Sequence, residues 1–136
     1  MNSKPSRPTA RGFALVEVLV SLLVFSLGVL GMVALQARAT AAAVDSEDRT
    51  RAALLVDDLV ATMWAQRSSS VSTAALTAWA TRLSDTSSLG LPGSPTYSVS
   101  TTAGVTTVTI SWNEPTRRDA SGNAATSTYS TQVVIP

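Results

Sequence analysis

The stretch that decides the fold is RGFALVEVLVSLLVFSLGVLGMVALQ, residues 11–36. Within it, Phe13 to Leu35 is a run of 23 residues with a single charge, on Glu17. As a helix rising about 1.5 Å per residue, this run would be about 35 Å long, enough to cross a hydrocarbon core of about 30 Å. The stretch therefore predicts a membrane-spanning helix that carries a carboxylate near its N-terminal end.

The charges before the run predict its orientation. Lys4, Arg7 and Arg11 precede it, and no acid lies among the first twelve residues. Basic residues next to a membrane-spanning helix favour the cytoplasmic side. We therefore expect a single-pass inner-membrane protein whose residues 1–12 are cytoplasmic and whose C-terminal head is periplasmic.

Three explanations compete for the apolar run. A cleaved signal peptide fits the basic start and the A-x-A site at residues 37–39, but the run is much longer than the usual apolar region of about 7–15 residues. A plain membrane anchor explains the length. It does not explain Glu17, because an acid costs about 2.5–3.5 kcal/mol at the centre of a membrane helix, and less near its edge. The third explanation is a processing site.

The motif Arg11-Gly12-Phe13-Ala14-Leu15-Val16-Glu17 resembles the processing site of type IV prepilins, the class III type that becomes N-methylated. The resemblance implies that a prepilin peptidase cuts between Gly12 and Phe13 and that Phe13 is then N-methylated. It also implies that Glu17 acts in assembly, by pairing with the N-terminal amine of a neighbouring subunit. The mature chain would be residues 13–136.

The spacing within this motif agrees with that role. Glu17 follows Phe13 by four residues, so both lie on one face of a helix. A free α-amino group is largely cationic at neutral pH. Two opposite unit charges about 4 Å apart attract by about 4 kcal/mol at an effective dielectric constant of about 20. A carboxylate that is costly in lipid would therefore become favourable once it met a partner amine.

The longer stretch GFALVEVLVSLLVFSLGVLGMVALQARA, residues 12–39, resembles the PilV group of minor pilins, the type IV pilus modification proteins. This implies a minor pilin that helps to initiate pilus assembly in a minor pilin complex and supports twitching motility, adhesion or DNA uptake. The implied partners are the prepilin peptidase, other minor pilins, the major pilin and the inner membrane. After assembly the protein would lie in the extracellular pilus.

Two points of this resemblance stay open. Major pilins usually have a helix-breaking proline in the second half of the segment, whereas this chain has Gly28 and Gly31. These glycines indicate either close helix packing or a segment that unwinds in the filament. The function also has alternatives: a minor pseudopilin of a type II secretion system, or a membrane-tethered binding module that never polymerises.

The remainder of the chain predicts a pilin-like α+β fold with a long N-terminal helix packed on about three antiparallel strands. Residues 36–67 form the amphipathic second half of the helix, with Val56, Leu59, Val60 and Met63 on one stripe and the charged residues, Asp48 among them, on the other sides. Residues 68–136 form the head, with a short helix over 74–83, in which Trp79 packs in the core. Alternation predicts strands around 97–100, 107–112 and 129–135, and a long loop over 114–125.

No catalytic pattern is present. The chain has no His and no Cys, and neither a nucleophile motif nor a phosphate-binding loop, so we expect a structural protein without cofactor, metal or small-molecule substrate. Beyond residue 12 the side chains carry a net charge of about −2, seven Arg against nine acids, which argues against nucleic acid as a direct ligand. Arg117-Arg118 fits a solvated loop better than a binding site, and Asp119–Asn123 fits a hairpin turn better than a calcium loop.

Overall fold

The computed structural model describes residues 11–135, with side chains described from Phe13 onward. The predicted leader, residues 1–12, therefore lies outside the described residues except for the backbone of Arg11 and Gly12. The chain divides into two compact units near Thr40, and each is described by itself. The long N-terminal helix and the small antiparallel sheet give the α+β, pilin-like arrangement that the sequence predicts.

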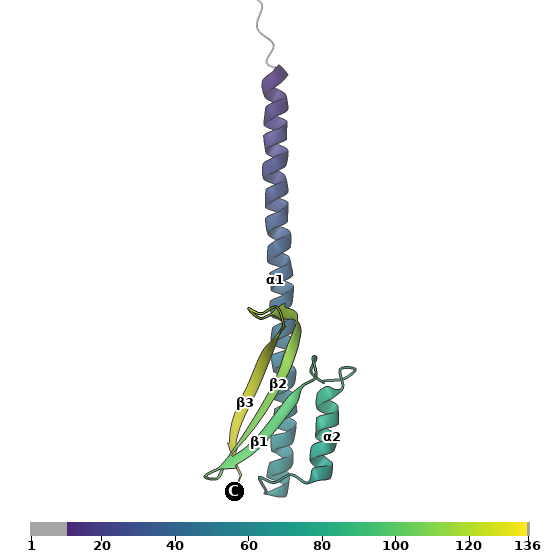
Figure 1. Ribbon diagram of the computed structural model, residues 1–136, viewed down its shortest axis with the longest axis vertical. Helices are drawn as coiled ribbons and strands as arrows, with labels where there is room; N and C mark the ends of the chain where they lie inside the picture. Colours follow the sequence, from purple (N-terminus) through teal and green to yellow (C-terminus); the bar gives the residue numbers. More distant parts are fainter. Residues whose placement is uncertain (1–10, 136) are drawn as a thin grey trace, which may run out of the picture. The chain divides into compact units, whose positions relative to one another are not determined.

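Helix α1 extends over Arg11–Gln66 (Figure 1). Residues 11–66 contain no proline, and their only glycines are Gly12, Gly28 and Gly31. The helix ends where Arg67 adopts a positive φ of 49° and the Ser68 amide donates to the Met63 carbonyl at 3.1 Å. A left-handed residue at this point is a common way to end a helix. The end near Arg67 confirms the prediction.

Helix α2 covers Thr73–Ser84, close to the predicted 74–83. The Ser72 side chain caps it by accepting a hydrogen bond from the Ala75 amide at 3.4 Å. Trp79 and Leu83 are buried, and the Trp79 indole Nε1 donates to the Leu55 carbonyl of α1 at 2.8 Å. The prediction that Trp79 packs in the core is confirmed, and its hydrogen bond fixes α2 against α1.

The sheet has three antiparallel strands in the order β1-β2-β3, with bounds Thr96–Thr102, Val105–Arg118 and Ala124–Val134. Ala103 and Gly104, both at positive φ, form the two-residue turn between β1 and β2. Figure 1 shows the sheet alongside the second half of α1, with α2 beside β1. The core between them consists of Ala52, Leu55, Val56, Leu59, Met63, Trp79, Leu83, Leu91, Val108, Ile110 and Trp112.

The outward face of the sheet is polar but uncharged. Thr109 pairs with Ser130 in the register, and their hydroxyl oxygens lie 3.0 Å apart. The next outward pair along the strands, Ser111 and Thr128, is also hydrogen-bonded, at 3.2 Å. The predicted alternation of apolar and polar residues therefore corresponds to one buried and one hydroxyl-rich face.

The prediction of a long loop over residues 114–125 is wrong. Strand β2 continues to Arg118 and β3 begins at Ala124, so only residues 119–123 connect them. Pro115 suggested a loop because proline cannot donate to a strand ladder. The strand accommodates it because the pairing of β2 with β3 shifts register between Glu114 and Arg118, and β1 does not extend this far.

The expectation that every charged residue of α1 lies away from the apolar stripe is wrong for one position. Asp48 is only 6% exposed, whereas Val56, Leu59 and Met63 lie in the core as predicted. Asp48 precedes the buried Ala52 by four residues and therefore continues its stripe by one turn. A rule based on residue type places an acid in solvent, but helix geometry turns this one inward.

Candidate processing and assembly site

The predicted cut lies at the beginning of α1. Arg11 and Gly12 are its first two residues, and Phe13 follows with 86% of its side chain exposed. Glu17 stands one helical turn after Phe13 and is also exposed. Within residues 13–135, no hydrogen bond or ion pair to the Glu17 carboxylate is present. The roles of Gly12, Phe13 and Glu17 stay predictions, but the helix does place Phe13 and Glu17 on one face.

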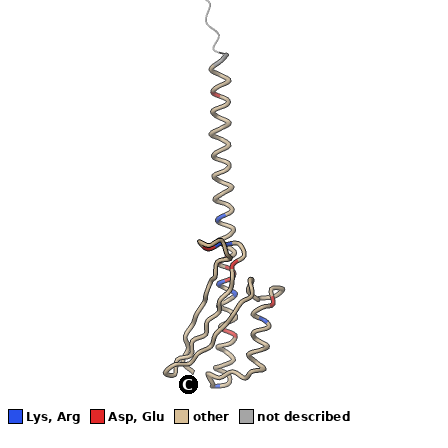
Figure 2. Tube along the Cα trace, viewed as in Figure 1, with Lys and Arg blue, Asp and Glu red and all other residues tan. Residues whose placement is uncertain are grey.

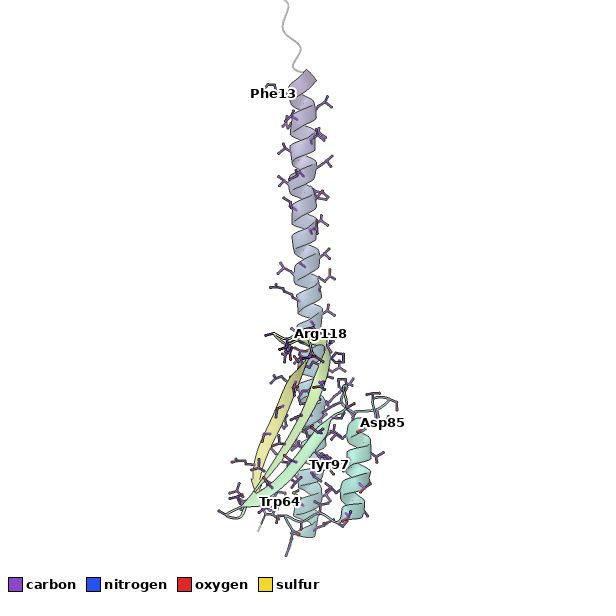
Figure 3. The ribbon with its side chains drawn as sticks, in the orientation of Figure 1. Phe13, Trp64, Asp85, Tyr97 and Arg118 are labelled. Carbon is purple, nitrogen blue, oxygen red and sulfur yellow. The ribbon has the colours of Figure 1, made fainter. Side chains whose placement is uncertain are left out.

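The apolar surface of this unit is uncovered. Every residue from Phe13 to Thr40 is exposed, and the most apolar 18-residue window has a mean hydropathy of 2.7. Figure 3 shows these side chains standing out from the helix, and Figure 2 shows how sparse charge is along it. Monomeric soluble proteins rarely expose contiguous apolar patches of this extent. The segment is long and apolar enough to cross a membrane, and its surface requires lipid or other helices around it.

The two glycines lie within this exposed helix. A Cβ added at Gly28 or Gly31 would meet no atom within 4 Å, so neither glycine is needed for contacts inside the chain. Ser26 donates to the Leu22 carbonyl at 2.6 Å and so satisfies its hydroxyl within the same helix. Any close packing at the glycines would therefore involve another molecule.

We expect the double variant Gly28→Ala, Gly31→Ala to reach the membrane at the wild-type level and to enter filaments less well. Alanine favours a helix by about 1 kcal/mol per site over glycine, and the added methyl groups meet nothing within the chain. Incorporation into filaments would therefore fall only if another helix must approach the glycines closely or if the segment must unwind. The measurement is the ratio of this protein in sheared filaments to that in membranes, with Val29→Ala as the control. An unchanged ratio would remove both interpretations of the glycines.

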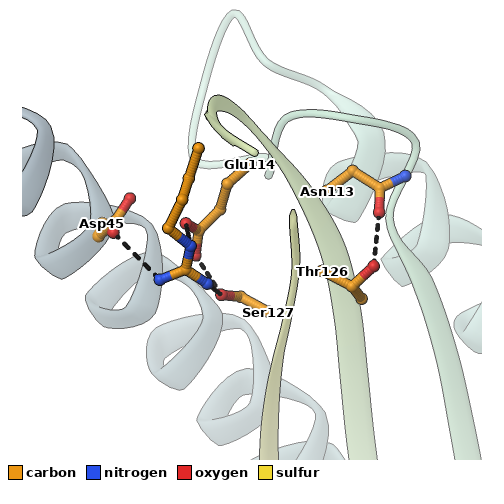
Figure 4. A network of polar contacts seen from close by, with 6 residues as sticks. Asp45, Asn113, Glu114, Thr126 and Ser127 are labelled. Atoms are coloured by element: carbon orange, nitrogen blue, oxygen red, sulfur yellow. Dashed lines mark hydrogen bonds and ion pairs between the residues drawn. The ribbon is translucent and has the colours of Figure 1, made fainter. Parts of the chain in front are cut away.

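In the head, a cluster of polar contacts joins three elements, α1, β2 and β3 (Figure 4). Glu114 of β2 is buried, accepts a hydrogen bond from the Ser127 hydroxyl of β3, and pairs with Arg117 Nε at 3.0 Å. Arg117 also donates to Ser127 Oγ at 3.2 Å and pairs with Asp45 of α1 at 3.4 Å. The prediction of a solvated arginine pair holds only in part for Arg117: its side chain is 46% exposed, but its ion pairs tie the sheet to the helix.

The turn between β2 and β3 serves the hairpin. Asp119 Oδ1 accepts hydrogen bonds from the amides of Ser121 and Asn123, at 2.8 and 2.9 Å. Gly122 has a φ of +83°, which suits glycine. The interpretation of this segment as a hairpin turn is confirmed, because two backbone amides of the turn bind the same carboxylate oxygen of Asp119.

Comparison with known proteins bears on the N-terminal unit. Residues 7–33 match the family model of the prokaryotic N-terminal methylation motif. The match spans the predicted cut and Glu17. No curated protein and no solved structure matches this chain.

The match supports a type IV pilin-like or pseudopilin-like protein. A prepilin-type motif implies processing by a prepilin peptidase and assembly with other pilins, and it suggests a structural rather than an enzymatic role. Together with the exposed apolar helix, it is consistent with an inner-membrane anchor. The head lies beyond the matched residues, so its contribution rests on its own geometry.

Proposed function

We propose that this chain is a minor pilin of a type IV pilus, similar to the PilV group, that helps to initiate pilus assembly together with other minor pilins. The observation that carries the proposal is the exposed, largely apolar helix over residues 13–40, in which the Glu17 carboxylate, four residues after Phe13, has no partner among the described residues. Lipid alone would be sufficient to cover the apolar surface of this helix. A carboxylate at that position favours a neighbour that brings both an apolar helix and an amine.

The proposed sequence of events follows from these groups. The peptidase hydrolyses the Gly12–Phe13 bond, which releases residues 1–12 and leaves Phe13 with a free α-amine. This amine is cationic at neutral pH and keeps its charge after methylation. The incoming subunit then leaves lipid for a bundle of similar helices, a transfer between two apolar surroundings. The pairing of its charge with that of a neighbour therefore contributes direction and register to assembly.

The head would remain in the periplasm during assembly and on the pilus surface afterwards. Its hydrophobic core, the Trp79 hydrogen bond to α1 and the Arg117 cluster hold it on the second half of α1. A head fixed in this way keeps its orientation relative to residues 41–66 of the helix. Functions such as twitching motility, adhesion or DNA uptake would follow from the pilus that the subunit helps to build.

Mass spectrometry of the protein from membranes and from sheared filaments tests the proposal. We expect a mature N-terminus at Phe13 that carries one methyl group, in both fractions. An N-terminus at Thr40, as a signal peptidase cut after Ala39 would leave, contradicts the prepilin assignment. A protein that is cut at Gly12 but is absent from sheared pili contradicts the pilus assignment and favours a pseudopilin.

A further inference from the structure

Asp48 is the one buried carboxylate of the second half of α1, and it has no partner. Its side chain is 6% exposed, and among the described residues no hydrogen bond or ion pair involves it. The neighbouring acids are all paired: Glu47 with Arg51 at 2.5 Å, Asp45 and Glu114 with Arg117 at 3.4 and 3.0 Å. A buried charge normally has a partner, because removing it from water is costly. The described chain therefore provides no partner for the Asp48 carboxylate, and a partner would have to come from another molecule.

A pocket opens beside this carboxylate. It has a volume of about 240 Å³ and lies between α1, the segment joining α2 to β1, and the end of β2. Its apolar wall includes Val44, Pro92 and Pro115, and its charged wall is formed by Glu47, Asp48 and Arg51. We call it the Asp48 pocket. Its apolar wall and acidic side together suit a ligand with an aliphatic stem and a cationic end.

The electrostatic surroundings favour a cation. Burial raises the pKa of Asp48, and Arg51 opposes this effect, whereas Glu47, Glu114 and Asp45 add to it. Four acids, Asp48 included, thus stand against two bases, Arg51 and Arg117, both of which are already paired. A cation placed beside Asp48 would stabilise its charged form, whereas an anion would meet net negative charge.

We propose that the Asp48 pocket binds the side chain of a lysine or arginine presented by another protein. The aliphatic stem would lie against Val44, Pro92 and Pro115, and the ammonium or guanidinium group would pair with Asp48. A neutral apolar ligand would leave the carboxylate unpaired. Residues 13–135 contain no group of three or more side chains placed to hold a metal ion. That the partner is a neighbouring filament subunit rests on the proposed function; the pocket itself does not.

A titration of the full-length, ¹⁵N-labelled protein in detergent micelles tests the proposal. The probes are the capped tripeptides Gly-Lys-Gly and Gly-Arg-Gly, with Gly-norleucine-Gly as a control of the same stem and no charge. We expect saturable shifts of the amide signals of Asp48, Gly90 and Thr116 with the basic peptides alone. Asp48→Asn should weaken this binding about tenfold or more, because it removes a charged hydrogen-bond partner. Asp57→Asn, which removes a carboxylate from the same helix at an exposed position outside the pocket, should leave the binding unchanged.

Measuring the stability of the folded head distinguishes a binding role of Asp48 from a structural one. Because the folded chain holds the Asp48 proton more tightly than the unfolded chain, stability should fall as pH rises from the ordinary aspartate range through the raised pKa. Asp48→Asn should remove this fall and raise the thermal midpoint of the head at neutral pH. A more stable variant that no longer binds the basic peptides is the expected result.

Three outcomes would overturn the proposal: no saturable shift with either basic peptide, equal affinity for the norleucine peptide, or undiminished binding by Asp48→Asn. If Asp48→Asn did not fold, the comparison of lysine with norleucine peptides on the wild-type protein would still decide. None of these results depends on cleavage at Gly12, so failure of the pocket and failure of the pilin assignment are distinguishable.

Discussion

Gly12→Val should leave the full-length precursor uncut in the membrane, with no mature chain detectable. A peptidase that acts at the membrane surface must reach the backbone of the scissile bond, and glycine gives the least obstruction because it has no Cβ. Valine adds a branched side chain directly before the cut. Because the proposed assembly step requires a free Phe13 amine, the same variant should also be absent from sheared filaments.

Mass spectrometry of membrane-extracted protein provides the measurement, with Ala14→Ser as the matched control. Ala14 is the second residue after the cut, on the other side from Gly12, and serine changes its size little. We expect Ala14→Ser to be cut and assembled as the wild type is. A mature N-terminus at Phe13 in the Gly12→Val protein would show that the peptidase does not read this position.

The N-terminal unit was predictable because its signals are local. The 23-residue apolar run, the basic flank and the spacing from Phe13 to Glu17 all lie in adjacent residues. A helix of this composition needs no tertiary partner to satisfy its backbone. The exposed helix over residues 13–40 and the match at residues 7–33 agree with that interpretation.

The head was predictable in its elements and less so in its polar details. Period-two alternation located all three strands, and the stripe of Val56, Leu59 and Met63 located the buried face of α1. Pro115 led to the wrong prediction of a loop, because the register shift that accommodates it depends on pairing with β3 and cannot be read from the sequence of one strand. Arg117 likewise gains its partners from residues 45 and 127, far away in the sequence.

Asp48 shows where a sequence signal existed and was outweighed. Its spacing of four residues to Ala52 and seven to Leu55 places it on the buried stripe. Composition argued the opposite, because acids are almost never fully buried unless paired. At this residue the preference of acids for solvent conflicts with the helical spacing that turns it inward. Such conflicts are expected at functional positions.

Glu17→Leu should abolish incorporation into filaments while leaving membrane level and cleavage normal. Leucine removes the cost of a carboxylate in lipid, so insertion should be undiminished. Gly12 and Phe13 are unchanged, so the peptidase should still cut. The incoming subunit would, however, lose the single side-chain charge that residues 13–35 carry, and with it the proposed partner of the N-terminal amine.

The control is Ser26→Leu, which places the same side chain in the same apolar segment. The Ser26 hydroxyl bonds to Leu22 of its own helix, so its removal leaves no group of another subunit unpaired. The amount of each variant in membranes and in sheared filaments, with the mature N-terminus checked by mass spectrometry, gives the three readouts. A plain anchor predicts that both variants behave as the wild type does. Wild-type recovery of Glu17→Leu in filaments would refute the pairing mechanism even if the cut at Gly12 were demonstrated, because the charge would then be dispensable for the step assigned to it.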